Sequence, residues 1–283
     1  MGNNQQKWTE VISSDTSIFK LNLSEVWRYR DLLFMFVKRD FVTFYKQTVL
    51  GPLWFIIQPL LTTLMFVVIF GNLANLSTDN SPKVVFYLAG VSIWAYFSET
   101  LTKTASVFTN NASIFGKVYF PRLIMPLSLV VSGLIKFGVQ FSIFVAVLLY
   151  YFFTKDNVNP NVYVLLTPIL LFLMGILALG LGMIISSMTT KYKDLTYLIS
   201  FGIQLFMYAT PVVYPLSSIP DKYKFLLLLN PLTAIFECFR YAFLGTGSFE
   251  FSTLAYSALV SIIILFLGIV IFNKVEKNFI DTV

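Results

Sequence analysis

The chain is predicted to be an all-α membrane protein with six transmembrane helices per subunit. Apolar residues make up 57% of its 283 residues and charged residues only 12%, whereas ordinary soluble domains carry about 25% charged residues. Six apolar segments are close to or longer than the roughly 20 residues that a helix needs to cross a bilayer. The Lys and Arg residues outside these segments are divided unevenly between the two sides, which predicts an orientation.

The six predicted spans cover residues 50–70, 84–106, 123–153, 162–188, 195–214 and 254–272. The second is the weakest candidate because Glu99 and Lys103 lie inside it. The third is too long for one straight crossing, and Pro121 and Pro126 indicate that its start belongs to a turn at the membrane surface. With six spans, thirteen Lys and Arg lie on the side of the amino terminus and five on the other. Both termini are therefore predicted to be cytoplasmic.

The segment before the first span divides into two parts. Residues 1–22 are polar with scattered charges, which indicates a cytoplasmic tail and no cleavable signal peptide. Residues 23–48 are predicted to form an amphipathic helix in the inner membrane interface, because charged and apolar side chains fall on opposite sides of a helical wheel. Residues 49–283 then form the transmembrane domain.

The stretch at residues 215–247 is predicted to form two short re-entrant helices on the outer side. Asn230 and Pro231 divide it into pieces too short to cross, and Glu237 and Arg240 would be costly in lipid. Their spacing of three residues suggests that Glu237 and Arg240 hold this helix pair in shape. A seventh crossing would also place the carboxyl terminus outside.

Several classes of function are poorly supported. The chain has no histidine, no GxxxxGK[ST] phosphate-binding loop and no metal-ligand spacing, and its one cysteine, Cys238, excludes an internal disulfide. Its basic residues form no soluble stripe for nucleic acid. We therefore expect a protein that is not an enzyme and that carries no cofactor or metal of its own.

Three charged residues inside apolar segments leave alternatives open. Glu99 and Lys103 face each other at i, i+4 and are either a pathway or gating pair or a self-neutralising pair near the membrane boundary. Lys136 lies deeper, and it either neutralises an acid on a neighbouring helix or extends toward the inner headgroups. The many aromatic residues fit interfacial belts and, more weakly, a carbohydrate path.

The loop at residues 107–122 is the most informative cytoplasmic segment. The loop begins with Asn and Ser, continues with a short apolar run and ends at a Pro. This pattern predicts one brief helix outside the membrane. Ile114, Phe115, Val118, Tyr119 and Phe120 are expected to be exposed there, which suggests a docking surface for a partner.

Four motifs occur in an order that resembles one family. They are YKQTVLGPLWFIIQPLL at 45–61, NNASIFGKVYFPRLIMPLS at 110–128, KYKDL at 191–195 and ATPVVYPLSSIPDKYKFLLLLNPLTAIFECFRYAFLG at 209–245. Together they resemble the permease subunit of bacterial polysaccharide-exporting ABC transporters of the O-antigen and teichoic acid type. The resemblance covers the chain from about Leu21 to its end.

This resemblance implies an inner-membrane homodimer that works with two copies of a separate cytoplasmic ATPase, which would hold ATP and Mg²⁺. It implies that residues 110–122 form the coupling helix, that 191–195 make a second ATPase contact, and that 215–245 form the outer gate. The docking residues it implies are Asn111, Ile114, Phe115, Lys117, Tyr119, Arg122, Lys191, Lys193 and Asp194. The outer-gate residues are Asn230, Pro231, Glu237 and Arg240.

The hypothesis that follows is ATP-driven export of a lipid-linked polysaccharide between the paired first and fifth spans. The residues expected to line the path are Trp54, Gln58, Gln204, Phe206, Tyr208 and Tyr214. Basic residues that either attract the substrate's pyrophosphate or contact lipid headgroups are Arg28, Lys38, Arg39 and Lys46. The alternatives are export of teichoic acid, capsule, a drug or a lipid on the same fold, and a membrane-embedded glycan enzyme.

Overall fold

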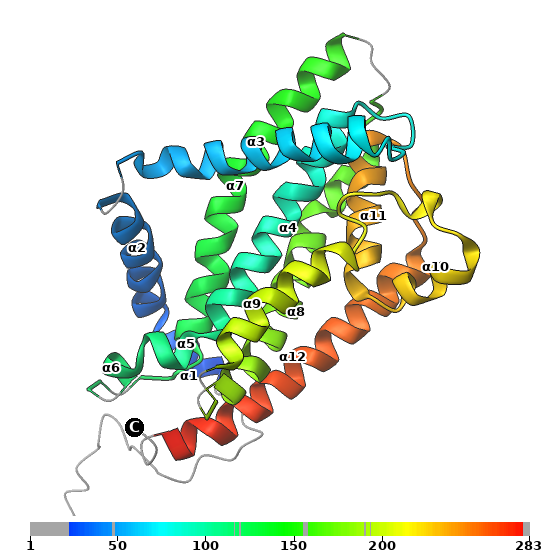
Figure 1. Ribbon diagram of the computed structural model, residues 1–283. Helices are drawn as coiled ribbons and strands as arrows, with labels where there is room; N and C mark the ends of the chain where they lie inside the picture. Colours follow the sequence, from blue (N-terminus) through cyan, green and yellow to red (C-terminus); the bar gives the residue numbers. More distant parts are fainter. Residues whose placement is uncertain are drawn as a thin grey trace, which may run out of the picture.

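Every regular element of the described chain is a helix, in agreement with the predicted all-α class (Figure 1). The computed structural model describes residues 23–46, 49–115, 117–118, 120–154, 158–189, 191–192 and 194–279. The predicted tail at residues 1–22 lies outside these ranges.

Within the described ranges, five helical segments are long and apolar enough to cross a membrane. These segments are Gly51–Leu73, Lys83–Ala105, Ile124–Phe153, Val162–Thr189 and Phe251–Val275. The helices that build them are α3 (Trp54–Phe66) with the π-helical η2 (Val67–Leu73), α4 (Lys83–Ala105), α7 (Ile124–Phe153), α8 (Thr167–Thr189) and α12 (Phe251–Phe279). The short 3₁₀ turns η1 (Gly51–Leu53) and η3 (Val162–Leu166) precede α3 and α8.

Two predicted spans differ from the structure. The expected crossing at 195–214 contains only α9 (Leu195–Tyr208), whose 14 residues extend about 21 Å, less than the roughly 30 Å of a bilayer core. Residues 209–214, which are not helical, carry the chain on from α9 toward α10 (Figure 1). The predicted third span is one uninterrupted helix, α7, of 30 residues. Pro126 is its third residue, where proline does not break a helix because no hydrogen bond is lost.

Helix α4 forms the centre of the protein. Of its most apolar stretch 78% is buried, compared with 17% for Gly51–Leu73, and it packs against α3, α7 and α8. Small residues allow this approach: a Cβ on Gly133 of α7 would lie 2.7 Å from Thr100 Oγ1, and one on Gly182 of α8 would lie 2.5 Å from Thr104. Helix α3 runs across α4 and α7 rather than alongside them (Figure 1).

The contact between α8 and α12 is close enough to exclude side chains. A Cβ on Gly268 of α12 would lie 2.5 Å from the carbonyl oxygen of Gly180, and one on Gly180 would lie 2.7 Å from the backbone of Leu265. The two backbones therefore pack directly at this crossing, which is the arrangement that small residues permit between membrane helices.

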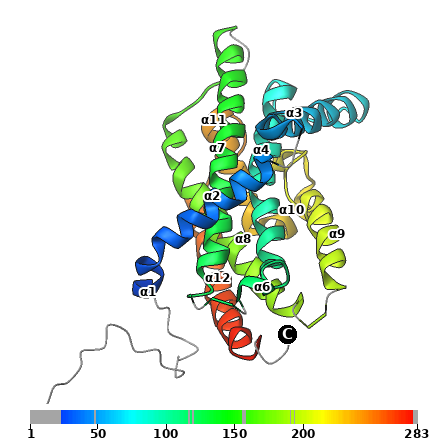
Figure 2. The same cartoon turned by 90° about the vertical axis from the view of Figure 1, so that its left-hand side faces the viewer.

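The predicted interface helix is divided into α1 (Leu23–Arg28) and α2 (Arg30–Lys46). The division is slight, since backbone hydrogen bonds from Tyr29 to Glu25 and from Leu33 to Tyr29 continue through it. Helix α2 crosses α7 and buries Phe36 and Val37 (Figure 2). We call one end of the molecule the basal end. It carries α5 (Val107–Asn110), α6 (Ala112–Phe115) and the last turns of α12 (Figure 1).

The opposite end carries η4 (Leu216–Ser218), α10 (Asp221–Leu228) and α11 (Pro231–Leu244). The chain breaks at Asn230 as predicted, and the axes of α10 and α11 differ by 103°. Asn230 caps α11 by accepting a hydrogen bond from the Leu232 amide at 3.0 Å, and Pro231 occupies the first helical position, where its missing N–H costs nothing. Cys238 lies fully buried on α11.

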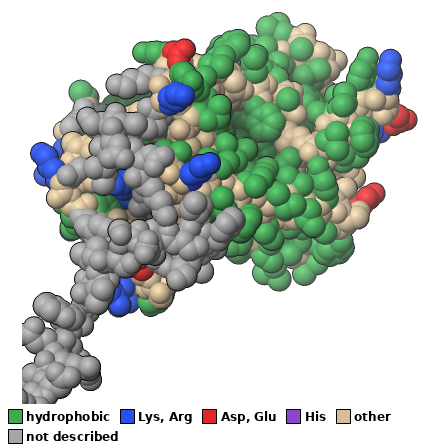
Figure 3. Space-filling view, turned by 90° about the horizontal axis from the view of Figure 1, so that it is seen from below, with side chains coloured by type: hydrophobic (Ala, Val, Ile, Leu, Met, Phe, Trp, Pro, Cys, Tyr) green, Lys and Arg blue, Asp and Glu red, His purple; other side chains and the backbone are tan. Residues whose placement is uncertain are grey.

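Large apolar side chains cover much of the flank of the molecule. Seen from the basal end, hydrophobic side chains dominate one side and Lys and Arg lie among other residues toward the opposite side (Figure 3). Helices α3, α9 and α12 each expose several of them, including Leu61, Leu64, Tyr197, Phe201, Leu205, Ile262 and Phe266. A surface this apolar faces lipid or another protein.

The backbone crossing of α8 and α12 gives a first prediction. Gly268→Ala places a methyl group against Gly180 and is expected to destabilise the protein by about 1–3 kcal/mol through overpacking. The matched control is Gly138→Ala on α7, where a new Cβ meets nothing within 4 Å. Thermal unfolding of both purified variants in the same detergent measures the difference. Equal midpoints would contradict direct backbone packing.

Candidate functional site

The basal end carries the segments predicted to contact an ATPase. The hydroxyl of Thr189, at the end of α8, donates a hydrogen bond to the Ala105 carbonyl at the end of α4, at 3.0 Å. This contact places the loop after α8 beside the start of α5. The structure therefore brings together residues 107–122 and 191–194, which are far apart in the sequence. Tyr119 and Lys193 lie outside the described residues.

Phe115 and Phe120 are buried, so the expectation that they are exposed is wrong. They are 5% and 4% exposed, and their rings stack at 5.8 Å. Phe108 lies 5.7 Å from Phe115 and stacks on Phe272 of α12 at 4.5 Å. The loop therefore folds its aromatic residues inward, and α6 is fixed to the end of α12.

Polar residues of the same segment also hold its shape. Asn111 donates from its amide to the Val107 carbonyl at 3.0 Å. The Arg122 guanidinium, 9% exposed, lies over the Phe115 ring at 5.6 Å. Ile114 is half-buried against the same apolar cluster.

The residues left for a partner are few. Lys117 is exposed and Val118 is 58% exposed. In the second loop, Lys191 and Asp194 are exposed, and the Lys191 ammonium lies 5.2 Å from the ring of Tyr192. These side chains form a small mixed surface at the basal end.

The basic residues of the interface helix are not equivalent. Arg28, Lys38 and Lys46 are exposed. Arg39 is half-buried and pairs with Asp40 at 3.0 Å, and its guanidinium lies 4.9 Å from the Phe36 ring. Arg39 is thus already neutralised by its neighbour.

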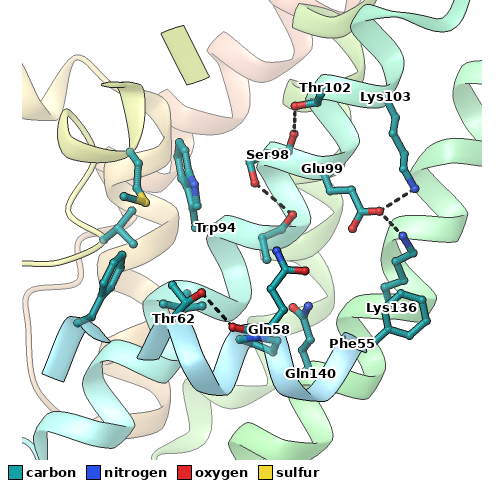
Figure 4. A pocket seen from close by; sticks show the side chains of 16 residues that line it. Phe55, Gln58, Thr62, Trp94, Ser98, Glu99, Thr102, Lys103, Lys136 and Gln140 are labelled. Carbon is teal, nitrogen blue, oxygen red and sulfur yellow. Dashed lines mark hydrogen bonds and ion pairs between the residues drawn. The ribbon is translucent and has the colours of Figure 1, made fainter. Parts of the chain in front are cut away.

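A cavity of about 470 Å³ opens between α3, α4 and α7. Its polar lining includes Gln58 of α3 and Gln140 of α7, whose amide groups both point into it (Figure 4). Phe55, Phe66, Trp94 and Met207 contribute apolar walls. Volumes of 300–1,000 Å³ with mostly apolar walls and a few polar groups are typical of ligand sites.

One carboxylate and two ammonium groups form the charged corner of this cavity (Figure 4). Glu99 pairs with Lys103 at 2.7 Å and also with Lys136 of α7. The Lys136 ammonium lies 5.0 Å from the Phe55 ring. The prediction that Lys136 neutralises an acid on a neighbouring helix is confirmed, and the Glu99–Lys103 pair is part of a three-residue cluster.

The predicted path residues are divided by α4. Gln58 lines the cavity, while Phe206 packs on Trp94 and Phe97 with ring centroids 6.2 Å apart in each case. Trp54, Gln204 and Tyr208 are exposed on α3 and α9.

Tyr214 follows α9 in the loop that returns toward α10. Its hydroxyl donates to the Tyr208 carbonyl at 2.9 Å. Burial raises the pKa of the Tyr214 phenol above its usual value, against the opposing effect of the Arg240 charge. The phenol therefore remains a neutral hydrogen-bond donor that closes the end of α9.

At the opposite end, Glu237 and Arg240 form a buried ion pair. They are 3% and 2% exposed, with the guanidinium 3.6 Å from the carboxylate. Arg240 donates to the carbonyl oxygens of Val212 at 2.6 Å and Tyr214 at 3.1 Å, and lies 3.9 Å from the Phe86 ring. The pair therefore ties α11 to α4 and to the loop after α9.

The carboxylate of this pair also accepts backbone hydrogen bonds. Its two oxygens accept from the amides of Leu216 at 3.3 Å and Ser248 at 3.5 Å. Asn230 adds a further link, donating to Thr210 Oγ1 at 2.9 Å. The predicted role of Glu237 and Arg240 in holding the shape of the helix pair agrees with this geometry.

Sequence reasoning missed most of the cavity lining, including Gln140 and Phe55. Gln140 is four residues after Lys136 and so lies on the same face of α7, a spacing that could have identified it. Phe55 gave no such signal, because its place beside Lys136 depends on α3 crossing α7.

The buried ion pair of α11 gives a second prediction. Arg240→Met leaves Glu237 buried without its cation and is expected to cost about 3–5 kcal/mol of stability. Adding Glu237→Gln should restore part of this loss, because no unpaired charge remains. Thermal unfolding measures both variants, with Lys224→Met in the exposed pair with Asp221 as a control that leaves the midpoint unchanged. A double variant no more stable than Arg240→Met would argue against the pair.

Comparison with known proteins agrees with this architecture. O-antigen export system permease proteins named RfbA are 29% identical over 252 residues in Klebsiella pneumoniae (89% of this chain, 94% of the relative) and 27% identical over 261 residues in Myxococcus xanthus (92% and 98%). The polysialic acid transport protein KpsM of Escherichia coli is 23% identical over 242 residues (84% and 91%). The profile of the ABC-2 type transporter family matches residues 31–244, and the chain belongs to this family.

Proposed function

We propose that this chain is the membrane-spanning subunit of an ATP-driven exporter of a lipid-linked polysaccharide of the O-antigen kind. The observation that carries this proposal is the similarity to O-antigen export permeases over 89–92% of the chain and 94–98% of those relatives. A likeness over nearly the full length of both proteins supports a shared kind of cargo more strongly than a shared fold does.

A second candidate cargo is a capsule-type polysaccharide. The similarity to the polysialic acid transport protein, 23% identical over 84% of this chain, supports it. Both candidates place a long glycan in the same path and differ in the sugar carried. Export of teichoic acid, a drug or a lipid is supported only by the family fold.

In this proposal ATP is hydrolysed by a separate cytoplasmic subunit present in two copies. That subunit would dock on the basal end, through Lys117 and Val118 and the neighbouring loop with Lys191 and Asp194. Because Phe115 and Phe120 join this segment to α12 and α7, a displacement at the surface would move both helices. Both termini would then be cytoplasmic, in the inner membrane of a bacterium.

The path itself would form between two copies of the chain. Trp54, Gln204 and Tyr208 are exposed on α3 and α9, and a second copy would enclose them. Large exposed apolar residues on the same helices supply a surface for pairing. The α10–α11 pair would act as the outer gate, with Asn230 and Pro231 at its bend and Glu237 and Arg240 at its base.

Docking through the exposed residues gives a third prediction. Val118→Asp is expected to lower copurification of the partner ATPase about tenfold, by introducing a charge that is desolvated on binding. Its thermal midpoint should stay at the wild-type value because the side chain is exposed.

Two further variants complete this test. Val162→Asp, at a residue that is 72% exposed in η3 at the opposite end of the molecule, should leave copurification unchanged. Phe115→Asp should lower the thermal midpoint as well as binding, because it places a charge in the basal core. Normal copurification of Val118→Asp would exclude this docking surface.

The cargo is tested in the organism. Deleting the chain is expected to remove surface polysaccharide and to leave lipid-linked glycan inside the cell, because synthesis continues without export. Immunoblots of intact cells and of membrane extracts measure the two pools, and reintroducing the wild-type chain is the control. Unchanged surface polysaccharide would rule out glycan export and favour a drug or lipid as cargo.

A further inference from the structure

The charged corner of the α3–α4–α7 cavity holds one more positive than negative charge. Its charged lining consists of Glu99, Lys103 and Lys136. Asp40 acts electrostatically on Lys103, but Asp40 pairs with Arg39 and therefore adds no net charge. Among the described residues that line the cavity, two ammonium groups therefore share one carboxylate.

This surplus charge lies deep in the protein. Lys136 is twelve residues into α7, about 18 Å along the helix axis, and its side chain is 9% exposed. Charged groups at such depth are costly in a membrane and usually mark a functional site. Attraction to an anion is strong there because the dielectric constant is low.

The rest of the lining suits an amphiphile. The amides of Gln58 and Gln140 point into the cavity beside the charged corner (Figure 4) and offer N–H donors. Phe66, Trp94 and Met207 line its apolar side. An anionic head can thus lie at one end and a hydrocarbon chain at the other.

We propose that this cavity binds the phosphate group of an amphiphilic lipid, with Lys103 and Lys136 holding the phosphate and Glu99 competing with it for both lysines. A phosphate has several acceptor oxygens and can bond both ammonium groups at once. The phosphate could belong to the exported lipid-linked glycan, in which case the assignment rests on the proposed function, or to a membrane phospholipid.

The test uses binding of radiolabelled farnesyl diphosphate to the full-length protein in phosphatidylcholine nanodiscs. Lys136→Gln removes a cation and should weaken binding about tenfold. Glu99→Gln removes the competing carboxylate and should strengthen binding several-fold. Lys103→Gln, at the half-exposed edge of the cluster, should weaken binding without the folding risk of the buried Lys136.

Two controls accompany these variants. Lys83→Gln lies at the other end of α4, where its ammonium donates to the Gly71 carbonyl at 2.6 Å, and should bind like the wild type. Unlabelled farnesol, which lacks the phosphate, should not compete. Competition by farnesol would overturn the proposal. So would changes of affinity in the same direction for Glu99→Gln and the lysine variants, because a cluster with a purely structural role does not predict that the two kinds of variant change affinity in opposite directions.

Changing the lipid composition of the nanodisc distinguishes the two possible sources of the phosphate. If phosphatidylglycerol in the nanodisc weakens farnesyl diphosphate binding, the site takes membrane phospholipid. If it has no effect, the site selects the diphosphate of a substrate-like lipid. Failure of the exporter proposal appears separately, as unchanged surface polysaccharide in the deletion strain, and does not alter the binding measurements.

Discussion

A charge inside a membrane protein must be neutralised by a neighbour, and this requirement determines how α4 is held. Near its basal end, Glu99 joins α4 to α7 through Lys136. Toward the other end, Phe86 lies against the guanidinium of Arg240, which joins α4 to α11 and the loop after α9. Helix α4 has the lowest mean hydropathy of the candidate spans and is also the most buried of them. Its polar residues need protein around them rather than lipid.

The two ends of the molecule are built by different means. The end opposite the basal end depends on a buried ion pair whose oxygens and nitrogens also bond the backbone of neighbouring loops. The basal end depends on stacked rings, with Phe108 between Phe115 and Phe272. These ring contacts join the segment to α12 through apolar packing alone.

Much of the fold follows from the sequence, and the remainder depends on tertiary contacts. Hydropathy located the long helices, because a run of apolar residues is a local property of the chain. The Asn230-Pro231 pair located the break between α10 and α11. The spacing of Glu99 and Lys103 predicted their pairing, and an acid on a neighbouring helix was one of the two alternatives for Lys136. Burial of Phe115 was missed, since an apolar residue in a polar loop has the same pattern whether it faces a partner or its own core. The shortness of α9 was missed too, because residues 209–214 are apolar without being helical.

The buried position of Cys238 has a practical consequence for spectroscopy. It is the one cysteine of the chain, and its side chain is shielded on α11. A maleimide or nitroxide reagent therefore meets no accessible thiol on the native protein. Reporter groups can be attached at a chosen surface residue without first removing an endogenous thiol, and distances between labels on the two ends can be followed through a transport cycle.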